Sequence, residues 1–353
     1  MKALVLSGGA GTRLRPFSYS MPKQLIPIAN RPVLAHVMDN LRALGITEIG
    51  IIVGERAHEI HAALGDGSEL GVRITYIQQD APRGLAHCVA IAREFLGDDD
   101  FVMYLGDNML PGGIAAAAED FARRRPAAQV LVHQVADPRA FGVAEVDAQG
   151  RVTALVEKPR EPRSDLALIG VYFFTAAVHR AVDAIGPSRR GELEITDALQ
   201  WLVEHGQDVR AHVHSGYWKD TGRVEDVLEC NREVLDALKP YLGGEVDAES
   251  ELIGPVVVED GARVVRSRIV GPAIIGGGSL IEDSLIGPHT SLGRDCAILS
   301  AEVGYSIALD GASVHLARIQ GSLIGRSAAV TRAPENIHRL VLGDHTRVEV
   351  AAG

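Results

Sequence analysis

Aliphatic residues followed directly by glycine recur through the last third of the chain, and this pattern narrows the possible folds most. Such a hexapeptide pattern turns one aliphatic side chain inward on each side of a prism and leaves small residues at the corners, where side chains would clash. At roughly 18 residues a coil, the segment is predicted to form a parallel β-helix of about four to five coils, and the helix is expected to be left-handed. An all-β domain of ordinary hairpins stays open as the alternative. The pattern recurs as Ile253-Gly254, Val270-Gly271, Ile275-Gly276, Ile286-Gly287, Leu292-Gly293, Val303-Gly304 and Ile324-Gly325.

The composition changes where this pattern begins. Residues 241–353 contain no lysine, only two aromatic residues and 16 of the 38 glycines, and they follow Lys239-Pro240. A chain of 353 residues is long enough for two domains of roughly 100–200 residues each. We therefore predict one domain over residues 1–240 and a second, hexapeptide-repeat domain over residues 246–353.

The predicted first domain alternates between two kinds of apolar pattern. Short runs rich in β-branched residues predict strands, and longer stretches with apolar residues three or four apart predict helices whose apolar faces form the core. This alternation favours an α/β fold with a mostly parallel, Rossmann-like sheet. The predicted strands are 2–6, 49–53, 73–77, 101–105 and 129–135, and the clearest helices are about 33–44, 85–96, 195–205 and 224–238.

Charge and cysteine content exclude several classes of function. The chain has 35 Lys and Arg against 46 Asp and Glu, a net charge of −11, so the basic surface of a nucleic-acid-binding protein is not expected. The three cysteines lie far apart and predict neither a disulfide framework nor a zinc site, which fits a reducing cytoplasm. The apolar run at the N-terminus is too short for a signal peptide or a membrane span, so no membrane association is expected.

The strongest local signal for chemistry is the glycine-rich segment after the first predicted strand, Leu6-Ser7-Gly8-Gly9-Ala10-Gly11-Thr12-Arg13-Leu14. Glycines allow the backbone to approach a phosphate closely and to point N–H groups at it. The segment lacks the Gly-Lys-Ser/Thr of a Walker A motif, and Leu14 stands where a dinucleotide-binding fingerprint needs glycine. Arg13 and Lys23 add two cations close to the turn, which favours a phosphate site over a plain tight turn.

This segment, together with Pro16 and Pro22-Lys23-x-x-x-Pro27, resembles the signature of the sugar-1-phosphate nucleotidyltransferases. Further segments follow in that family's order and approximate spacing, and with the C-terminal pattern the chain is most similar to the family's long form that transfers thymidylate to glucose 1-phosphate. The segments are Gln79 with Gly84-Leu85-Ala86-His87, Leu105-Gly106-Asp107-Asn108, Phe141-Gly142-Val143, Val156-Glu157-Lys158-Pro159, residues 191–197 (GELEITD) and Trp218-Lys219-Asp220-Thr221-Gly222.

The resemblance implies an enzyme that joins dTTP to glucose 1-phosphate, releases pyrophosphate and gives dTDP-glucose, the first committed step of a deoxysugar pathway. The same reaction with UTP, GTP or another sugar 1-phosphate stays open, because thymine and uracil differ by one methyl group, worth about 1–3 kcal/mol of discrimination. The implied cofactor is Mg²⁺, the implied partners are the two small-molecule substrates, and a homo-oligomer is expected.

The resemblance also implies roles for individual residues. Arg13, Lys23, Asp107 and Lys158 are expected to carry catalysis, and Asp107 and Asp220 to hold the metal ion. Two carboxylates beside phosphate oxygens suit octahedral Mg²⁺, and Asp107 follows a predicted strand, at the carboxyl edge where α/β sheets bind ligands. The expected nucleotide contacts are Leu6, Gly8, Gly9, Gly11, Thr12, Arg13, Gln79 and Gly84, and the expected sugar-phosphate contacts are Lys23, Gly142, Glu157, Lys158 and Val171.

Three other functions are alternatives to this one. A hexapeptide-repeat acyltransferase could use His289 or His315 as a base, although four to five coils make a short stack for coenzyme A. A binding protein built on a decayed transferase would have lost charged site residues, but Arg13, Lys23 and Lys158 are present. A nicotinamide-dependent enzyme is disfavoured by the glycine spacing and by the absence of an acidic ribose-binding residue about 20 positions on.

Overall fold

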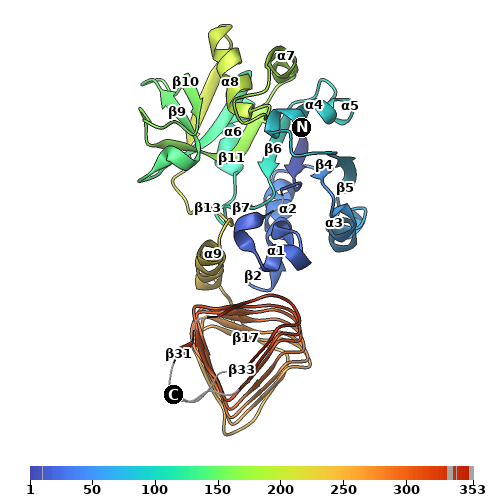
Figure 1. Ribbon diagram of the computed structural model, residues 1–353, viewed down its shortest axis with the longest axis vertical. Helices are drawn as coiled ribbons and strands as arrows, with labels where there is room; N and C mark the ends of the chain where they lie inside the picture. Colours follow the sequence, from blue (N-terminus) through green and yellow to red (C-terminus); the bar gives the residue numbers. More distant parts are fainter. Residues whose placement is uncertain (10, 332–336, 339, 350–353) are drawn as a thin grey trace. The chain divides into compact units, whose positions relative to one another are not determined.

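The computed structural model describes residues 1–353 except residues 10, 332–336, 339 and 350–353. The chain divides into two compact units (Figure 1). The first contains Met1–Gly9 and Leu34–Asp220, and the second contains Ala10–Val33 and Thr221–Gly353. The predicted domains, 1–240 and 246–353, concern which parts fold independently, and they stay a prediction that truncation would test.

A nine-stranded mixed sheet forms the centre of the first unit. Strands β6, β1, β4 and β5 are parallel to one another, whereas β11 runs antiparallel to β6, β8 and β9. The prediction of a mostly parallel α/β sheet is thus confirmed. The order is β10 (Val152–Glu157), β9 (Gly142–Val146), β11 (Leu166–Phe174), β6 (Phe101–Leu105), β1 (Lys2–Leu6), β4 (Glu48–Val53), β5 (Arg73–Gln78), with β8 (Ala128–Gln134) and β12 (Val209–Val213) branching from β11.

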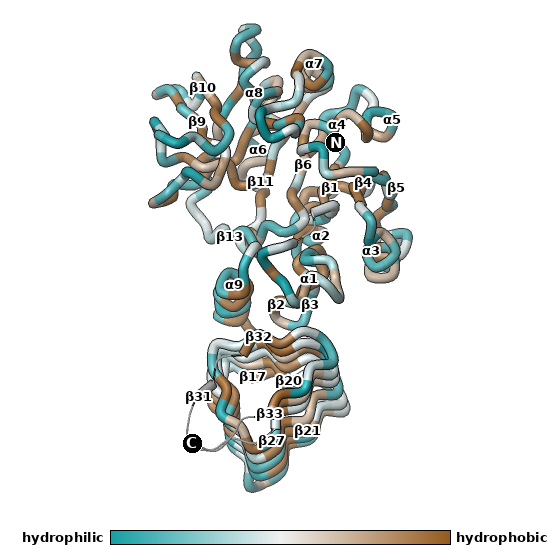
Figure 2. Tube along the Cα trace, viewed as in Figure 1, coloured by the Kyte–Doolittle hydropathy of each residue, from teal (hydrophilic) through white to brown (hydrophobic). Residues whose placement is uncertain are grey.

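Helices cover both faces of this sheet because its central strands are buried and apolar along their length. Figure 2 shows β1, β6 and β11 as mostly hydrophobic segments. On one face, Phe101 and Met103 of β6 join a core with α4 (Leu85–Ile91), α7 (Ala177–Ala184) and α8 (Ile195–Glu204). On the other, Asn40 of α2 (Val33–Ala43) donates a hydrogen bond to the Tyr104 hydroxyl (3.1 Å), and Phe121 of α6 (Ala115–Arg124) stacks on Phe173. Two further helices of this unit are α3 (Ala57–Leu64) and α5 (Arg93–Leu96).

The second unit contains a parallel β-helix, which confirms the prediction from the aliphatic-glycine pairs. Its three sheets contain seven, seven and six strands, so the expected four to five coils were too few. The first coil starts at Tyr241, before the Ile253-Gly254 pair, and the last strand ends at Glu349, beyond the Ile324-Gly325 pair. Each strand residue lies opposite its counterpart one coil further on: Arg263 is paired with Leu280, and Leu280 with Ala297.

The β-helix core is a stack of aliphatic side chains, among them Val264, Ile281, Ile298, Val314 and Val330, all at most 1% exposed. The first sheet contains β14 (Tyr241–Leu242), β17 (Val256–Val258), β20 (Ala273–Ile275), β23 (Thr290–Leu292), β26 (Ile307–Ala308), β29 (Leu323–Ile324) and β32 (Val341–Leu342). The second contains β15 (Glu245–Val246), β18 (Arg263–Val265), β21 (Leu280–Glu282), β24 (Ala297–Leu299), β27 (Ser313–His315), β30 (Ala329–Thr331) and β33 (Arg347–Glu349). The third contains β16 (Glu251–Ile253), β19 (Arg268–Val270), β22 (Leu285–Ile286), β25 (Glu302–Gly304), β28 (Arg318–Gln320) and β31 (Ile337–His338).

Helix α9 (Val224–Asp236) packs against the β-helix within the second unit. Asn231 is fully buried there: its Oδ1 accepts hydrogen bonds from the Ala29 amide and the Ser291 hydroxyl, both at 2.8 Å, and its Nδ2 donates to the His289 carbonyl at 3.2 Å. The same unit contains α1 (Phe17–Ser20) and the short hairpin of β2 (Pro27–Ile28) and β3 (Arg31–Pro32). Among the described residues, no helix is long and apolar enough to cross a membrane.

Candidate functional site

The chain turns sharply at the end of β1, where the backbones of two loops touch. A Cβ on Gly54 would lie 3.2 Å from the Gly8 carbonyl oxygen, and a Cβ on Gly8 would lie 3.2 Å from Oε1 of Gln79. Glycine at both positions therefore allows this approach. Beside them, Ser7 is 6% exposed, and its hydroxyl has no hydrogen-bond partner in the part of the chain that the structure describes. The first unit thus brings Gly8 and Gln79, two of the predicted nucleotide-binding residues, into contact, while Gly9 is exposed.

The side-chain amide of Gln79 is held in one orientation. Its Nε2 lies 3.1 Å from Nδ1 of His87 and 3.3 Å from Sγ of Cys88, both on α4. Burial raises the pKa of the Cys88 thiol to about 12, so this group stays neutral near pH 7. Nε2 is occupied by its contacts with α4, so Oε1, the acceptor atom of the amide, lies on the side of Gly8.

Gly84 joins two of the predicted motifs. It begins α4 with φ 101°, and a Cβ there would lie 2.3 Å from the carbonyl oxygen of Leu193. The backbones also bond directly, because the Leu193 amide donates to the Arg83 carbonyl at 2.8 Å and the Ala86 amide donates to the Leu193 carbonyl at 3.0 Å. Residues 83–86 are therefore joined to the segment around Leu193 by backbone hydrogen bonds. This close approach requires glycine at position 84.

The cationic part of the glycine-rich segment belongs to the second unit. Arg13 lies in a short 3₁₀ turn, Thr12–Leu14, and Lys23 begins another, Lys23–Leu25. The buried side chains of Leu14 and Phe17 anchor this stretch, and Thr12 and Arg13 are exposed. A Cβ on Gly11 (φ 60°) would lie 3.3 Å from Cβ of Lys23, so Gly11 and Lys23 are neighbours.

The two predicted metal-binding carboxylates meet in a small two-stranded ribbon of the first unit. Strand β7 (Asn108–Met109) pairs antiparallel with β13 (Lys219–Asp220), and Asp220 lies directly opposite Asn108, the residue after Asp107. Asn108 holds the ribbon together: its Nδ2 donates to Asp107 Oδ1 at 3.1 Å, and its Oδ1 accepts from Trp218 Nε1 at 2.7 Å. Strand pairing thus brings Asp107 and Asp220, which are far apart in sequence, to the same ribbon.

This pair of carboxylates suits a magnesium ion better than a transition metal. Among the described residues there is no group of three or more His, Cys, Asp or Glu side chains that could hold a metal. Mg²⁺ is usually bound through one or two carboxylates, with waters and substrate phosphates completing its octahedral shell. Asp107 is 8% exposed and Asp220 is half-buried, so Asp107 and Asp220 supply the number and type of ligands that such a site needs.

A second charged cluster surrounds Glu157 at the end of β10. Its Oε1 lies 3.4 Å from Nζ of Lys158 and 3.3 Å from Nη1 of Arg190, and its Oε2 accepts from the Thr196 hydroxyl at 3.2 Å. A Cβ on Gly142 would lie 3.2 Å from Oε2 of Glu157 and 2.7 Å from Thr196, so Gly142 leaves room for this cluster. The structure therefore brings three of the predicted sugar-phosphate residues together.

Two other predicted binding residues, Leu6 and Val171, have only their main chains available for contact with a substrate. The side chains of Leu6 and Val171 are 6% and 0% exposed and lie in the core. Val171 follows Gly170 (φ 75°), where β11 shifts register, and a Cβ on Gly170 would lie 3.0 Å from Nδ2 of Asn108. The backbone at 170–171 therefore runs beside the turn that contains Asp107.

Sequence reasoning did not assign roles to several residues of these clusters. His87 and Thr196 lie inside quoted motifs, so their place in the motif was available but not their contact. Arg190 lies just outside residues 191–197 and bonds to three carboxylates, those of Glu157, Glu192 and Glu194, at 3.1 to 3.3 Å. Its only advance signal was its position one residue before that motif.

The two histidines considered as catalytic bases for acyl transfer are His289 and His315. His289 lies at a corner of the β-helix, and its Nε2 is 2.7 Å from Oδ1 of Asp236 at the end of α9. It therefore joins α9 to the β-helix. His315 is an exposed residue at the end of β27. Neither placement favours the acyltransferase alternative.

Comparison with known proteins agrees with the geometry. Residues 2–237 match the nucleotidyl transferase family. Over its whole length the chain is 54% identical to a glucose-1-phosphate thymidylyltransferase of Streptomyces griseus, with all of both chains covered, and 56% identical to one of Streptomyces antibioticus, with 99% of each covered. A Bacillus anthracis structure assigned as a glucose-1-phosphate thymidylyltransferase, in complex with sucrose, is 35% identical with a TM-score of 0.61, covering 65% of this chain and 94% of that one.

Proposed function

Because the chain belongs to the nucleotidyl transferase family, we propose that it transfers thymidylate from dTTP to glucose 1-phosphate, giving dTDP-glucose and pyrophosphate. The observation that carries this proposal is the match of 54–56% identity to two glucose-1-phosphate thymidylyltransferases over the full length of the chain, the β-helix included. Two substrates, an NTP and a sugar 1-phosphate, follow from the reaction. The cytoplasm is the proposed location, supported by three buried cysteines that are all free.

In the proposed reaction, a phosphate oxygen of glucose 1-phosphate attacks the α-phosphorus of dTTP in line, and the bond from the α-phosphorus to the bridging oxygen breaks as pyrophosphate leaves. The attacking oxygen is already ionised at neutral pH, so no general base is required. The two substrates together carry roughly six negative charges, and such transfers depend on positioning and neutralising this charge. An acidic protein must therefore gather cations locally.

Arg13, Lys23 and Lys158 are the proposed cations. Arg13 and Lys23 follow Gly8, Gly9 and Gly11 in the glycine-rich segment, and Lys23 is assigned to the phosphates near the reacting centre. Arg13 is assigned to the leaving phosphates, and Lys158 to the sugar phosphate. Its neighbour Glu157 accepts hydrogen bonds from sugar hydroxyls, and the contact of Glu157 with Gly142 and Thr196 supports this role.

Asp107 and Asp220 are the proposed ligands of Mg²⁺. When bound, the ion supplies positive charge at the phosphate oxygens, which lowers their repulsion toward the attacking oxygen. The residues' own part is to keep two carboxylates side by side, which the β7–β13 ribbon and the hydrogen bonds of Asn108 support.

The test is a pyrophosphate-release assay that crosses dTTP, UTP, GTP, CTP and ATP with glucose 1-phosphate and other sugar 1-phosphates. We expect the highest kcat/KM with dTTP and glucose 1-phosphate, and UTP as the nearest competitor because its base lacks only the methyl group. A higher kcat/KM with GTP or ATP would contradict the proposed base, and no pyrophosphate with any pair would contradict the proposed reaction.

A further inference from the structure

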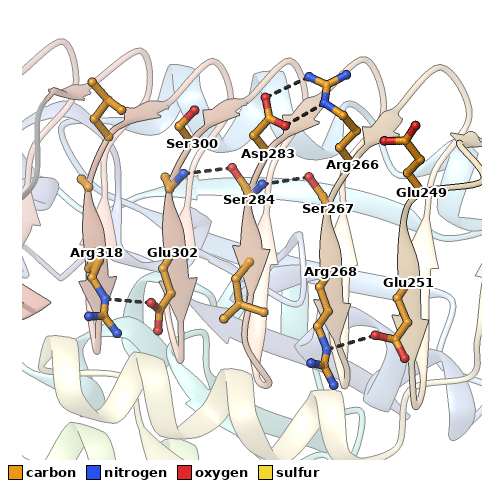
Figure 3. Close-up of a pocket in the computed structure, with 14 residues that line it drawn as sticks. Glu249, Glu251, Arg266, Ser267, Arg268, Asp283, Ser284, Ser300, Glu302 and Arg318 are labelled. Atoms are coloured by element: carbon orange, nitrogen blue, oxygen red, sulfur yellow. Dashed lines mark hydrogen bonds and ion pairs between the residues drawn. The ribbon is translucent and has the colours of Figure 1, made fainter.

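The third sheet of the β-helix presents a charged row whose order is unusual. At the first position of successive strands stand Glu251, Arg268, Leu285, Glu302 and Arg318, each directly opposite the next in the parallel register. The charges therefore run minus, plus, apolar, minus, plus across five neighbouring strands (Figure 3). Neighbouring strands are about 4.8 Å apart, so the row is about 20 Å long.

The row is exposed, and its charges pair within each half. Arg268 Nε lies 3.2 Å from Glu251 Oε2, and Arg318 Nε lies 2.7 Å from Glu302 Oε2, with all four side chains 40–61% exposed. Leu285, half-buried, separates the two pairs. The row borders a cavity of about 670 Å³ on this face. Exposed pairs of this kind contribute little to stability, about 0–1 kcal/mol each, so the stability of the β-helix itself does not account for their order.

This order is complementary to itself when reversed. A two-fold axis lying in an interface and parallel to the strands keeps each position along a strand and reverses the order of the coils. Glu251 then faces Arg318 of a second copy, Arg268 faces Glu302, and Leu285 faces Leu285. An axis along the stack of coils would instead bring Glu251 against Glu251 and Arg268 against Arg268, so the charges select the first arrangement.

The next outward-facing row has complementary shape under the same operation. Two positions further along the strands stand Ile253, Val270, Gly287, Gly304 and Gln320, so Ile253 and Val270 fill one half, Gly287 is central, and the other half has one glycine and Gln320. A cavity of about 270 Å³ borders Val270, Gly287 and Gly304. Reversal places Val270 of one copy opposite Gly304 of the other, an apolar side chain against a vacant position, and Gly287 opposite Gly287.

The corner row, which precedes these strands, consists of Glu249, Arg266, Asp283, Ser300 and Leu316, and it contributes one contact between like charges. Asp283 would face its own copy, but Arg266 already neutralises it, with Nε and Nη2 at 2.7 and 2.8 Å from its carboxylate oxygens. The flanking positions in that row do not repeat the like-charge contact, because Arg266 would face Ser300 and Glu249 would face Leu316. The cross-interface ion pairs therefore outnumber this single acidic contact.

We propose that the outer surface of β16, β19, β22, β25 and β28 is an interface for a second copy of this chain, in which the two β-helices lie face to face with their coils in opposite order. The face measures roughly 25 by 15 Å, about 400 Å² per copy, against about 800 Å² per partner in a standard interface. This interface is therefore reversible, and because its pairs are exposed it weakens with salt.

Sedimentation of the full chain over a range of concentrations at low and high NaCl tests the interface. We expect the mass to double as the concentration rises, and the dissociation constant of the dimer to increase at least about tenfold at high salt. The double variant Arg268→Glu, Arg318→Glu makes every charged residue of the row acidic, so each charged contact between copies becomes a like-charge contact. The dissociation constant of the dimer should therefore rise by about a hundredfold. Arg263→Glu, a charge reversal on another side of the prism where Arg263 pairs with Glu245, should not affect it.

A charge-swapped chain makes the test specific to the reversed order. Glu251→Arg, Arg268→Glu, Glu302→Arg and Arg318→Glu together keep the pairs within each copy and restore complementarity between two swapped copies. The swapped chain should therefore form dimers as the parent chain does. When parent and swapped chains are mixed, they should form no dimer that contains one of each. Unchanged mass in the double variant, or free mixing of parent and swapped chains, would overturn the proposal. Circular dichroism confirms that each variant is folded.

Discussion

The side-chain amide of Gln79 lies 3.1 Å, nitrogen to nitrogen, from the imidazole Nδ1 of His87, and this contact decides which way the amide points. Because an amide nitrogen can only donate, Nδ1 of His87 accepts, and Oε1 of Gln79 faces Gly8. In the proposed function this oxygen accepts the N3–H of thymine, so His87 is a positioning residue for base recognition.

Replacing His87 with Ala should therefore raise the KM for dTTP several-fold, since one hydrogen bond contributes about 1 kcal/mol, and leave kcat nearly unchanged. Gln79→Ala should raise the KM further, and adding His87→Ala to it should change little more. Steady-state kinetics with dTTP and UTP measures both effects. A His87→Ala variant that lowers kcat without changing the KM would contradict a positioning role.

Asp220 lies opposite Asn108, the residue after Asp107, in the β7–β13 ribbon, and the charges of Asp107 and Asp220 are the basis of the proposed metal site. Asp107→Asn and Asp220→Asn should each lower kcat by about 100-fold or more, because the amide keeps the shape but not the charge. Paramagnetic resonance of Mn²⁺ in the presence of dTTP should show weaker binding in both. Asp183→Asn, which changes an exposed carboxylate paired with Arg93, serves as the control with normal activity.

Arg190 bonds to Glu157 at 3.3 Å, together with Lys158, and so holds the proposed sugar-binding carboxylate. Arg190→Ala should raise the KM for glucose 1-phosphate several-fold with a smaller effect on the KM for dTTP, because the Glu157 carboxylate loses one of its donors. The neighbouring Arg189→Ala is the matched control. Equal changes in both KM values would argue against a role confined to the sugar.

Asn231 connects α9 to Ser291 of β23 and to Ala29, and it is fully buried. Asn231→Ala leaves these donors without an acceptor, at a cost of about 2–4 kcal/mol in the free energy of unfolding, since each buried unsatisfied group costs about 1–3 kcal/mol. Ser291→Ala, which removes a single donor, should cost about 1 kcal/mol. Thermal unfolding followed by circular dichroism ranks the two, and equal melting temperatures for parent and Asn231→Ala would contradict this account.

Stability should fall at alkaline pH because of two buried thiols. Burial raises the pKa of Cys88 and of Cys296 to about 12. The unfolded thiol has a pKa of about 8.5, so between about pH 8.5 and 10 the unfolded chain loses protons that the folded chain keeps. Each thiol then lowers the free energy of unfolding by up to about 1.4 kcal/mol per pH unit.

Urea unfolding at pH 8 and pH 10 measures this loss. The double variant Cys88→Ala, Cys296→Ala should be less stable at pH 8, because two packed side chains are gone, but its stability should depend less on pH. The window ends at pH 10 because burial also raises the pKa of Tyr104 and Tyr172, whose titration in the unfolded chain begins there. An equal pH dependence in parent and variant would rule out the thiols as the cause.

Much of the architecture follows from local patterns in the sequence. The run Lys2–Leu6 and its glycine turn, the helix after Pro32 and the aliphatic-glycine pairs are such patterns, and local periodicity reflects which face of an element is buried. The number of coils was underestimated because the pairs Leu242-Gly243 and Leu342-Gly343, in the first and last coils, were not counted with the others. The row from Glu251 to Arg318 shows a similar limit, because its members become neighbours only once the length of each coil is known.

The order of the amino acids alone specified the two kinds of core, the family and the residue types available for phosphate and metal chemistry, because each of these rests on neighbours in sequence. Folding decided which of those residues act on one another. Asp220 lies opposite Asn108, Arg190 contacts Glu157, and Asn231 contacts Ala29 through strand pairing and helix packing between segments that are distant in sequence. Hydrogen bonds and ion pairs act over a few ångströms. The function of a residue therefore depends on which residues the tertiary structure places beside it.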